Sequence, residues 1–215
     1  AAATELRAMI DADEKSGATP SLDRLQLLGN AYLKMNDSAG YAYGLAMSGH
    51  RIDAFNWAGA TIAATATGDE AYATGIYASS YDGYVFNGGA VSASAHGDSD
   101  GYADGVYIDC TFSFFRSGLA SSVTATASGY WNADAYGVYI DGLGTTVYAE
   151  GAFNATATAD ADEGEANAFG IDAYGYLGVN VTTYAGSSIH ATATGYDATA
   201  IGLGVYGYNS LGVNN

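Results

Sequence analysis

The sequence predicts an all-β fold, a parallel β-helix of about six coils over residues 38–215, preceded by a short helical segment over residues 1–37. Three observations predict it. The sequence repeats about every 32 residues, each repeat contains three strand-like words, and small apolar residues alternate with hydroxylated ones inside the words. Such a repeat is typical of a solenoid, in which each repeat forms one coil.

The first word of each repeat is a short alternating segment, for example VTATASG at residues 123–129. Similar segments begin at Ile62, Val91, Phe153 and Ile189. One parity holds small apolar residues and the other mainly holds Thr or Ser, and successive side chains of a strand point to opposite faces. We therefore expect the alanines to face a narrow core and the hydroxyl groups to face solvent.

The second word has the form Ala-x-Ala-x-Gly-apolar-x-apolar, and its glycine recurs at positions 44, 75, 105, 137, 170 and 202. We call these residues the pivot glycines. The inward parity passes from Ala73 to Ile76 across one of them, which a bulge or bend at the glycine explains. A third, less regular apolar word, such as YVF at residues 84–86, completes a three-sided coil.

Residues 1–37 have apolar side chains at helical spacing, after the possible capping residues Thr4 and Ser21. We expect two short helices that cover the first coil, because the end of a solenoid exposes unpaired backbone groups.

Charge is distributed unevenly along the chain. Residues 35–215 hold 18 of the 23 acids but only two of the six bases, Arg51 and Arg116, a balance of −16. We therefore do not expect nucleic acid to be a partner, because phosphate binding needs clustered cations. No apolar run is long enough for a membrane span. Cys110 is the single cysteine, so no intrachain disulfide can form, and we expect it to be buried.

The alternation of words such as ATATG and ATGIY over residues 40–215 resembles the β-helical passenger repeats of bacterial autotransporters and haemagglutinin-like surface adhesins. The resemblance implies a protein that is secreted or exposed on a bacterial surface.

Outward columns of like residues are the candidate binding surfaces. The first word predicts a hydroxyl column, and the second word predicts two tyrosine ladders, one on each side of the pivot glycine. These side chains could simply suit exposed strands, or the rings could stack on sugars or on another copy of the chain. The hydroxyl column is Thr65, Ser94, Thr126, Thr156 and Thr192, the first ladder is Tyr41, Tyr72 and Tyr102, and the second is Tyr77, Tyr107 and Tyr139.

Acidic residues suggest two further sites. Asp160, Asp162, Glu163 and Glu165 occupy a loop about three residues longer than its counterparts. Carboxylate oxygens suit Ca²⁺, so calcium is possible there, with a solvated turn as the alternative. No other cofactor is expected.

Catalysis has little support in the sequence. The three histidines occupy different phases of the repeat, and polysaccharide-cleaving sites need a carboxylate pair, or acids beside a base, on one wall. Asp98, Asp100 and Asp104 could supply such a pair, but we expect no enzymatic activity.

These features predict a non-enzymatic extracellular structural or adhesive protein that associates with other copies of itself in a surface fibre or biofilm matrix. The sixth coil stops in its middle strand within residues 206–215, so either the sequence is part of a longer solenoid or another copy completes the coil, and we expect head-to-tail assembly. Two alternatives remain. One is an ice-binding solenoid that uses the Thr ladder, and the other is a β-helix that binds or cleaves carbohydrate.

Overall fold

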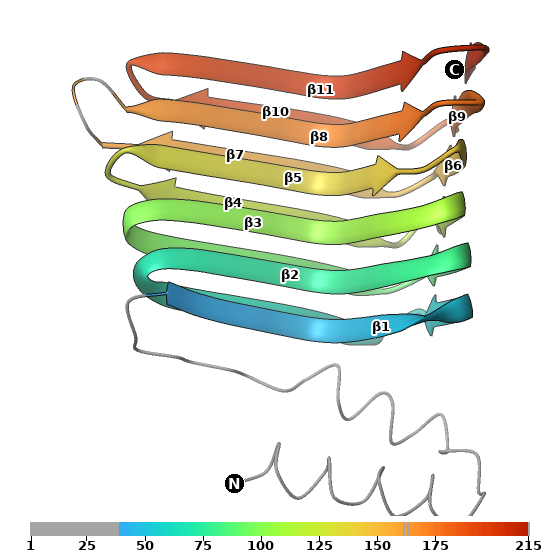
Figure 1. Cartoon of the computed structure of the whole chain (residues 1–215), viewed down its shortest axis with the longest axis horizontal. Helices are drawn as coiled ribbons and strands as arrows, with labels where there is room; N and C mark the ends of the chain where they lie inside the picture. Colours follow the sequence, from blue (N-terminus) through green and yellow to red (C-terminus); the bar gives the residue numbers. More distant parts are fainter. Residues whose placement is uncertain (1–38, 161, 163, 215) are drawn as a thin grey trace, which may run out of the picture.

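The computed structural model describes residues 39–160, 162 and 164–214, which form a parallel β-solenoid (Figure 1). Every strand pairing within this part of the chain is parallel, and most join residues 30 to 33 positions apart. The strands are β1 (Ala39–Asn56), β2 (Thr61–Asn87), β3 (Ala90–Ser117), β4 (Ser122–Gly129), β5 (Asn132–Asp141), β6 (Gly144–Ala149), β7 (Ala152–Ala159), β8 (Glu165–Gly175), β9 (Gly178–Thr183), β10 (Ser188–Thr194), β11 (Asp197–Gly207) and β12 (Leu211–Asn214).

The strands build three walls, as the three words of each repeat predict. Wall A contains residues 61–67 of β2, residues 90–96 of β3, and β4, β7 and β10. Wall B contains residues 39–49, 70–80 and 100–110, and β5, β8 and β11. Wall C contains residues 51–56, 82–87 and 112–117, and β6, β9 and β12. We call one segment of one wall a rung, so the described residues give five rungs on wall A and six on each of the other walls.

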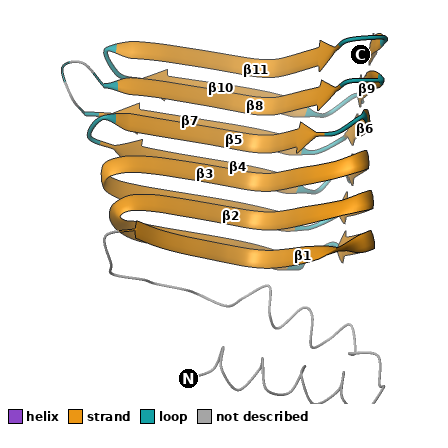
Figure 2. Cartoon of the chain, viewed as in Figure 1, coloured by secondary structure: helices purple, strands orange, loops and turns teal. Residues whose placement is uncertain are grey.

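The lower coils differ from the expected pattern of three separate strands. β2 and β3 each run through all three walls as one strand, whereas the upper coils are interrupted by turns (Figure 2). The corners explain the difference. Between walls B and C, the turn from β5 to β6 contains Gly142 and Gly144, and the turn from β8 to β9 contains Gly175 and Gly178. The same corner of β2 is formed by Ser80, Tyr81 and Asp82 and has no glycine. Glycine weakens extended strand structure and favours turns.

The core has a narrow part and a wide part. Seventeen buried alanines form one cluster between walls A and B, and they include Ala93, Ala125 and Ala155, each no more than 2% exposed. Larger side chains such as Ile108, Val123 and Phe115 form a second cluster, to which wall C contributes. The predicted inward parity of the alanines is therefore confirmed, and the alanine rows allow the two walls to approach closely.

The pivot glycines mark a bend in wall B. Buried positions change parity there, from Ala71 and Ala73 to Ile76 and Ala78, as predicted. A Cβ atom at Gly105 would collide with the side chain of Val123 and lie 2.5 Å from the carbonyl oxygen of the pivot glycine in the next coil. The bend therefore brings backbone so close to neighbouring atoms that a side chain does not fit.

Buried polar side chains hold the corner between walls C and A. Asn56 Nδ2 donates to Asn87 Oδ1 at 2.8 Å, and Asn87 Nδ2 donates to the Ser122 carbonyl oxygen at 3.3 Å. Ser117 takes the equivalent position one coil further on, where its Oγ accepts a hydrogen bond from Glu150 N at 2.9 Å. These bonds satisfy backbone groups that the turn leaves without ladder partners.

The two helices expected within residues 1–37 lie outside the described residues. Within the described part of the chain, no helix has the length and apolarity that crossing a bilayer requires.

Candidate functional surfaces

Wall A presents the predicted hydroxyl column. Thr65, Ser94, Thr126, Thr156 and Thr192 are paired in register from rung to rung. Four of these residues are exposed to solvent, and Thr65 is half-buried. The neighbouring column, two residues further along each strand, contains Thr67, His96, Ser128, Thr158 and Thr194. Nine of these ten positions are Thr or Ser, so wall A presents a regular hydroxylated surface.

The first tyrosine ladder lies on wall B as predicted. Tyr41, Tyr72 and Tyr102 stack with ring centroids 4.7 and 4.8 Å apart and with ring planes within 7° of parallel. Their faces therefore cover one another, and solvent mainly meets the ring edges and hydroxyl groups. Tyr72 donates to Glu70 Oε2 at 3.2 Å, and burial, followed by the charge of Glu70, raises the pKa of Tyr72 to about 12. Its hydroxyl group is protonated at neutral pH.

The second ladder, Tyr77, Tyr107 and Tyr139, is also in register, with centroids 5.5 and 5.1 Å apart. Asp172 replaces tyrosine in the next rung. The stacking supports the interpretation that both ladders stabilise neighbouring coils. A sugar ring would find the inner ring faces of the first ladder already occupied.

Two carboxyl groups on wall B are strongly perturbed. Asp104 lies directly before a pivot glycine, where burial and then the charge of Asp134 raise its pKa to about 7. Asp172 is 1% exposed, and burial raises its pKa to about 6 against the opposing effect of a hydrogen bond from Tyr174. Asp172 Oδ1 has no hydrogen-bond partner within the described residues. These groups make the stability of wall B sensitive to pH.

Wall C carries an exposed aromatic surface that the sequence analysis did not identify. We call it the wall C patch and define it as Phe55, Trp57, Tyr84, Phe86, Phe114 and Tyr148, which contact one another in an unbroken series. Phe55 is 42% exposed and Trp57 is 49% exposed. Phe55 and Trp57 stack on each other at 8°, whereas their contacts with Tyr84 and Phe86 are tilted at 46° and 53°, so the rings of neighbouring coils overlap only in part.

Both cationic side chains of the described residues also lie on wall C. Arg51 Nε lies 3.3 Å from Asp53 Oδ2, and Arg116 Nη2 lies 3.4 Å from Glu150 Oε1. Arg116 shares a column with Phe55, Phe86 and Tyr148 of the patch. Arginine and large aromatic residues are the types enriched at the energetic centres of protein interfaces.

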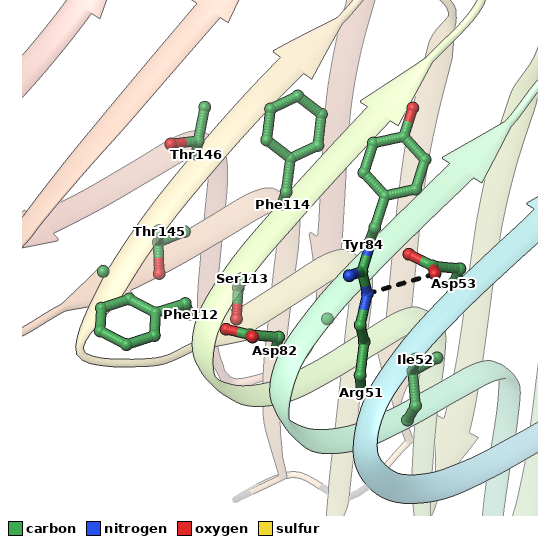
Figure 3. A pocket seen from close by; sticks show the side chains of 12 residues that line it. Arg51, Ile52, Asp53, Asp82, Tyr84, Phe112, Ser113, Phe114, Thr145 and Thr146 are labelled. Atoms are coloured by element: carbon green, nitrogen blue, oxygen red, sulfur yellow. Dashed lines mark ion pairs between the residues drawn. The ribbon is translucent and has the colours of Figure 1, made fainter.

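An open groove of 560 Å³ runs along the first residues of the wall C rungs and shares Tyr84 and Phe114 with the patch. Figure 3 shows Tyr84 and Phe114 standing side by side, with Arg51 reaching toward Asp53. The groove is also lined by Phe112, which is 43% exposed. Its volume is within the range of small-molecule sites, about 300–1,000 Å³.

The structure describes three of the four acidic residues proposed for calcium. Asp160 and Asp162 are exposed near the turn between β7 and β8, while Glu165 Oε1 accepts a hydrogen bond from Asn167 at 2.8 Å. Glu163 lies outside the described residues. Among the described residues, no three His, Cys, Asp or Glu side chains are grouped to hold a metal ion. Calcium binding stays a prediction.

The acids considered for catalysis lie on the β3 strand. Asp98 is exposed, and Asp100 Oδ1 accepts a hydrogen bond from Asn132 at 2.6 Å. Asp104 is at the bend, and none of the three acids lines the groove. Cys110 is 1% exposed, which confirms its predicted burial.

A scan against protein-family models, a search of curated proteins and a search of solved structures each found no match to this chain.

Proposed function

We propose that this chain is a non-enzymatic structural and adhesive protein that acts outside the cell, and that its adhesive contact is made by wall C. The observation that carries the proposal is the wall C patch, in which Phe55 and Trp57 are exposed and the column of Phe55 and Phe86 continues with Arg116. Large exposed apolar patches on soluble proteins usually mark interaction sites. The resemblance of the repeats to surface adhesins supports an extracellular location.

The contrast between the walls supports the choice of wall C. The Tyr41 ladder of wall B is stacked within 7° of parallel, so its inner faces are covered. Wall A has small hydroxylated side chains that offer little apolar area. Wall C combines aromatic area with both arginines of the described residues, and the ladder hydrogen bonds beneath hold it rigid. A rigid platform loses little conformational entropy on binding.

The experiment displays the full chain on bacterial cells that do not aggregate by themselves. Cell settling and attachment to polystyrene and to cellulose-coated glass are measured for the wild type and for the double variant Phe55→Ser/Trp57→Ser. We expect the double variant to lose most of the attachment. A wall A control, Thr126→Ala/Thr156→Ala, should attach like the wild type. Equal behaviour of both variants, or a wild type that adheres to nothing, would contradict the proposal.

Head-to-tail association of copies is part of the proposal. Ile189, Leu203 and Val205 in β10 and β11 are only partly buried although they pack against the core. A further coil stacked on them would bury them, and we propose that a second copy supplies it. Light scattering of the full chain should then show particle mass rising with concentration. A constant monomer mass would rule this association out.

Ice binding is a second candidate function, favoured by the wall A array in which nine of ten adjacent positions are Thr or Ser. In-register rungs about 4.8 Å apart present these hydroxyl groups as a lattice that could order water. Thermal hysteresis of the wild type, abolished by Thr126→Leu/Thr156→Leu, is the expected result for this candidate. Absence of hysteresis in the wild type would eliminate it.

A further inference from the structure

The groove on wall C is bordered by two columns of residues that are in register from coil to coil but differ in type. One outward column borders it with Arg51, Asp82, Phe112 and Gly144, and a second borders it with Asp53, Tyr84, Phe114 and Thr146. Because these residues are in register, the groove runs along the solenoid axis across four coils. A linear ligand that lies along the groove could contact charged residues in the first coils and aromatic rings in the next.

The groove offers both kinds of contact that a sugar ring uses. The exposed ring of Phe112 and the stacked pair Tyr84 and Phe114, with centroids 5.1 Å apart, provide apolar surface for the C–H faces of a pyranose. The carboxylates of Asp53 and Asp82 accept hydrogen bonds from sugar hydroxyl groups, and Arg51 donates them. A few polar groups among aromatic rings are typical of ligand sites.

Charge favours a neutral ligand. Asp53, Asp82 and Arg51 together give the groove a net charge of −1, and Arg51 is already paired with Asp53 at 3.3 Å. The whole chain has a net charge of −17. An anionic glycan would therefore be repelled both locally and at long range. A neutral glycan can satisfy the carboxylates with its hydroxyl groups without this repulsion.

We propose that this groove binds a neutral oligosaccharide, with its chain along the solenoid axis. The inference rests on the proposed adhesive function, because it names the chemical class of one target. Phe112 supplies the exposed stacking ring, and Asp82 accepts hydrogen bonds from the sugar. Tyr41, on wall B, lies outside the groove lining and takes no part in this contact.

Isothermal titration calorimetry of the full chain tests the proposal with cellohexaose, xylohexaose and mannohexaose, and with the anionic hexagalacturonate. We expect at least one neutral hexaose to bind and hexagalacturonate to bind more weakly or not at all. Phe112→Ala and Asp82→Asn should each weaken the neutral complex about tenfold, since each removes a central contact. Tyr41→Ala, the matched control, replaces an aromatic ring of wall B that is 48% exposed and outside the groove, and it should bind like the wild type. Circular dichroism verifies that each variant is folded.

Three results would overturn the proposal: no neutral hexaose binds, hexagalacturonate binds more tightly than the neutral sugars, or Tyr41→Ala weakens binding as much as Phe112→Ala. These failures are distinct from failure of the adhesive function. If displayed cells still attach through Phe55 and Trp57 while no hexaose binds, only the glycan assignment is wrong. If attachment is also insensitive to those residues, the wall C function is wrong as well.

Discussion

Gly105 shows at the scale of one residue why the pivot position of each repeat is glycine. A Cβ atom there would overlap the side chain of Val123 and approach the carbonyl oxygen of Gly137 to 2.5 Å. We expect Gly105→Ala to lower the free energy of unfolding by about 1–3 kcal/mol, the usual cost of overpacking. Urea unfolding measures it. Gly202→Ala is the matched control, because its nearest neighbouring atom would lie 3.5 Å away. An equal loss in both variants would contradict this explanation.

The raised pKa of Asp104 leads us to expect that the stability of the chain depends on pH. Its pKa is raised from 3.8 to about 7, first by burial and then by the charge of Asp134. The folded chain therefore keeps this proton at pH values where the unfolded chain has released it. Consequently, the free energy of unfolding falls as pH rises from about 4 to about 7, and remains lower above that range. Asp172, with a pKa of about 6, contributes in the same direction.

The substitution Asp104→Asn removes the titrating carboxyl group while keeping the side chain nearly the same size. We expect the variant to exceed the wild type in free energy of unfolding by about 1–3 kcal/mol near pH 8, and to match it near pH 4. Urea unfolding at both pH values measures the difference. Asp109→Asn, at an exposed position of the same strand, should show no such gain. A gain for Asp104→Asn that is equal at both pH values would show that the buried charge is not its cause.

At the scale of an element, neighbouring residues of a wall A strand have different roles: one packs in the core and the next faces solvent. Ala125 is 0% exposed within the alanine cluster, while Thr126 is exposed. Ala125→Leu should therefore lower the free energy of unfolding by about 1–3 kcal/mol. Thr126→Ala should change it by less than about 0.5 kcal/mol. Thermal or urea unfolding compares them, and a larger loss for Thr126→Ala would mean that the register is wrong.

Walls A and B could be predicted from the sequence because, within each strand, the residues at alternate positions belong to different chemical types. Alanine on one parity and Thr, Ser or Tyr on the other indicate which side faces the core, and the repeat places equivalent residues in one column. The structure confirms the alanine core, the change of parity at the pivot glycines and the pairing within the hydroxyl column and both ladders. What these columns bind stays a prediction.

Wall C could not be assigned in the same way. In Phe112-Ser-Phe-Phe115 the outward residues are Phe112 and Phe114, while the inward residues are Ser113 and Phe115. Aromatic residues thus occupy both parities, and alternation alone does not reveal the exposed face. A sequence pattern also does not give the angles between rings, which are within 7° in the Tyr41 ladder and reach 46° to 53° between coils on wall C. One available signal was that Arg51 and Arg116 both fall in the third word of the repeat.

At the scale of the whole molecule, the solenoid distributes its surfaces by wall. Wall A is hydroxylated, wall B has stacked tyrosines and acids, and wall C has exposed aromatic rings with both arginines of the described residues. Stacking identical coils repeats each surface along the axis, so one residue position becomes a column. The adhesive role of wall C is therefore a property of the stack rather than of one coil.

The two tryptophans of the chain provide the most direct test of wall C as the contact surface. Trp57 belongs to the wall C patch and is 49% exposed, whereas Trp131 lies beside the corner of walls A and B and is 50% exposed. In Trp131→Phe the emission reports Trp57 alone, and in Trp57→Phe it reports Trp131 alone. The measurement is fluorescence and acrylamide quenching of each variant, free and bound to the surface to which displayed cells attach. We predict that Trp57 shifts to shorter wavelength and becomes protected from quenching while Trp131 does not change. Protection of Trp131 with no change at Trp57 would contradict the account.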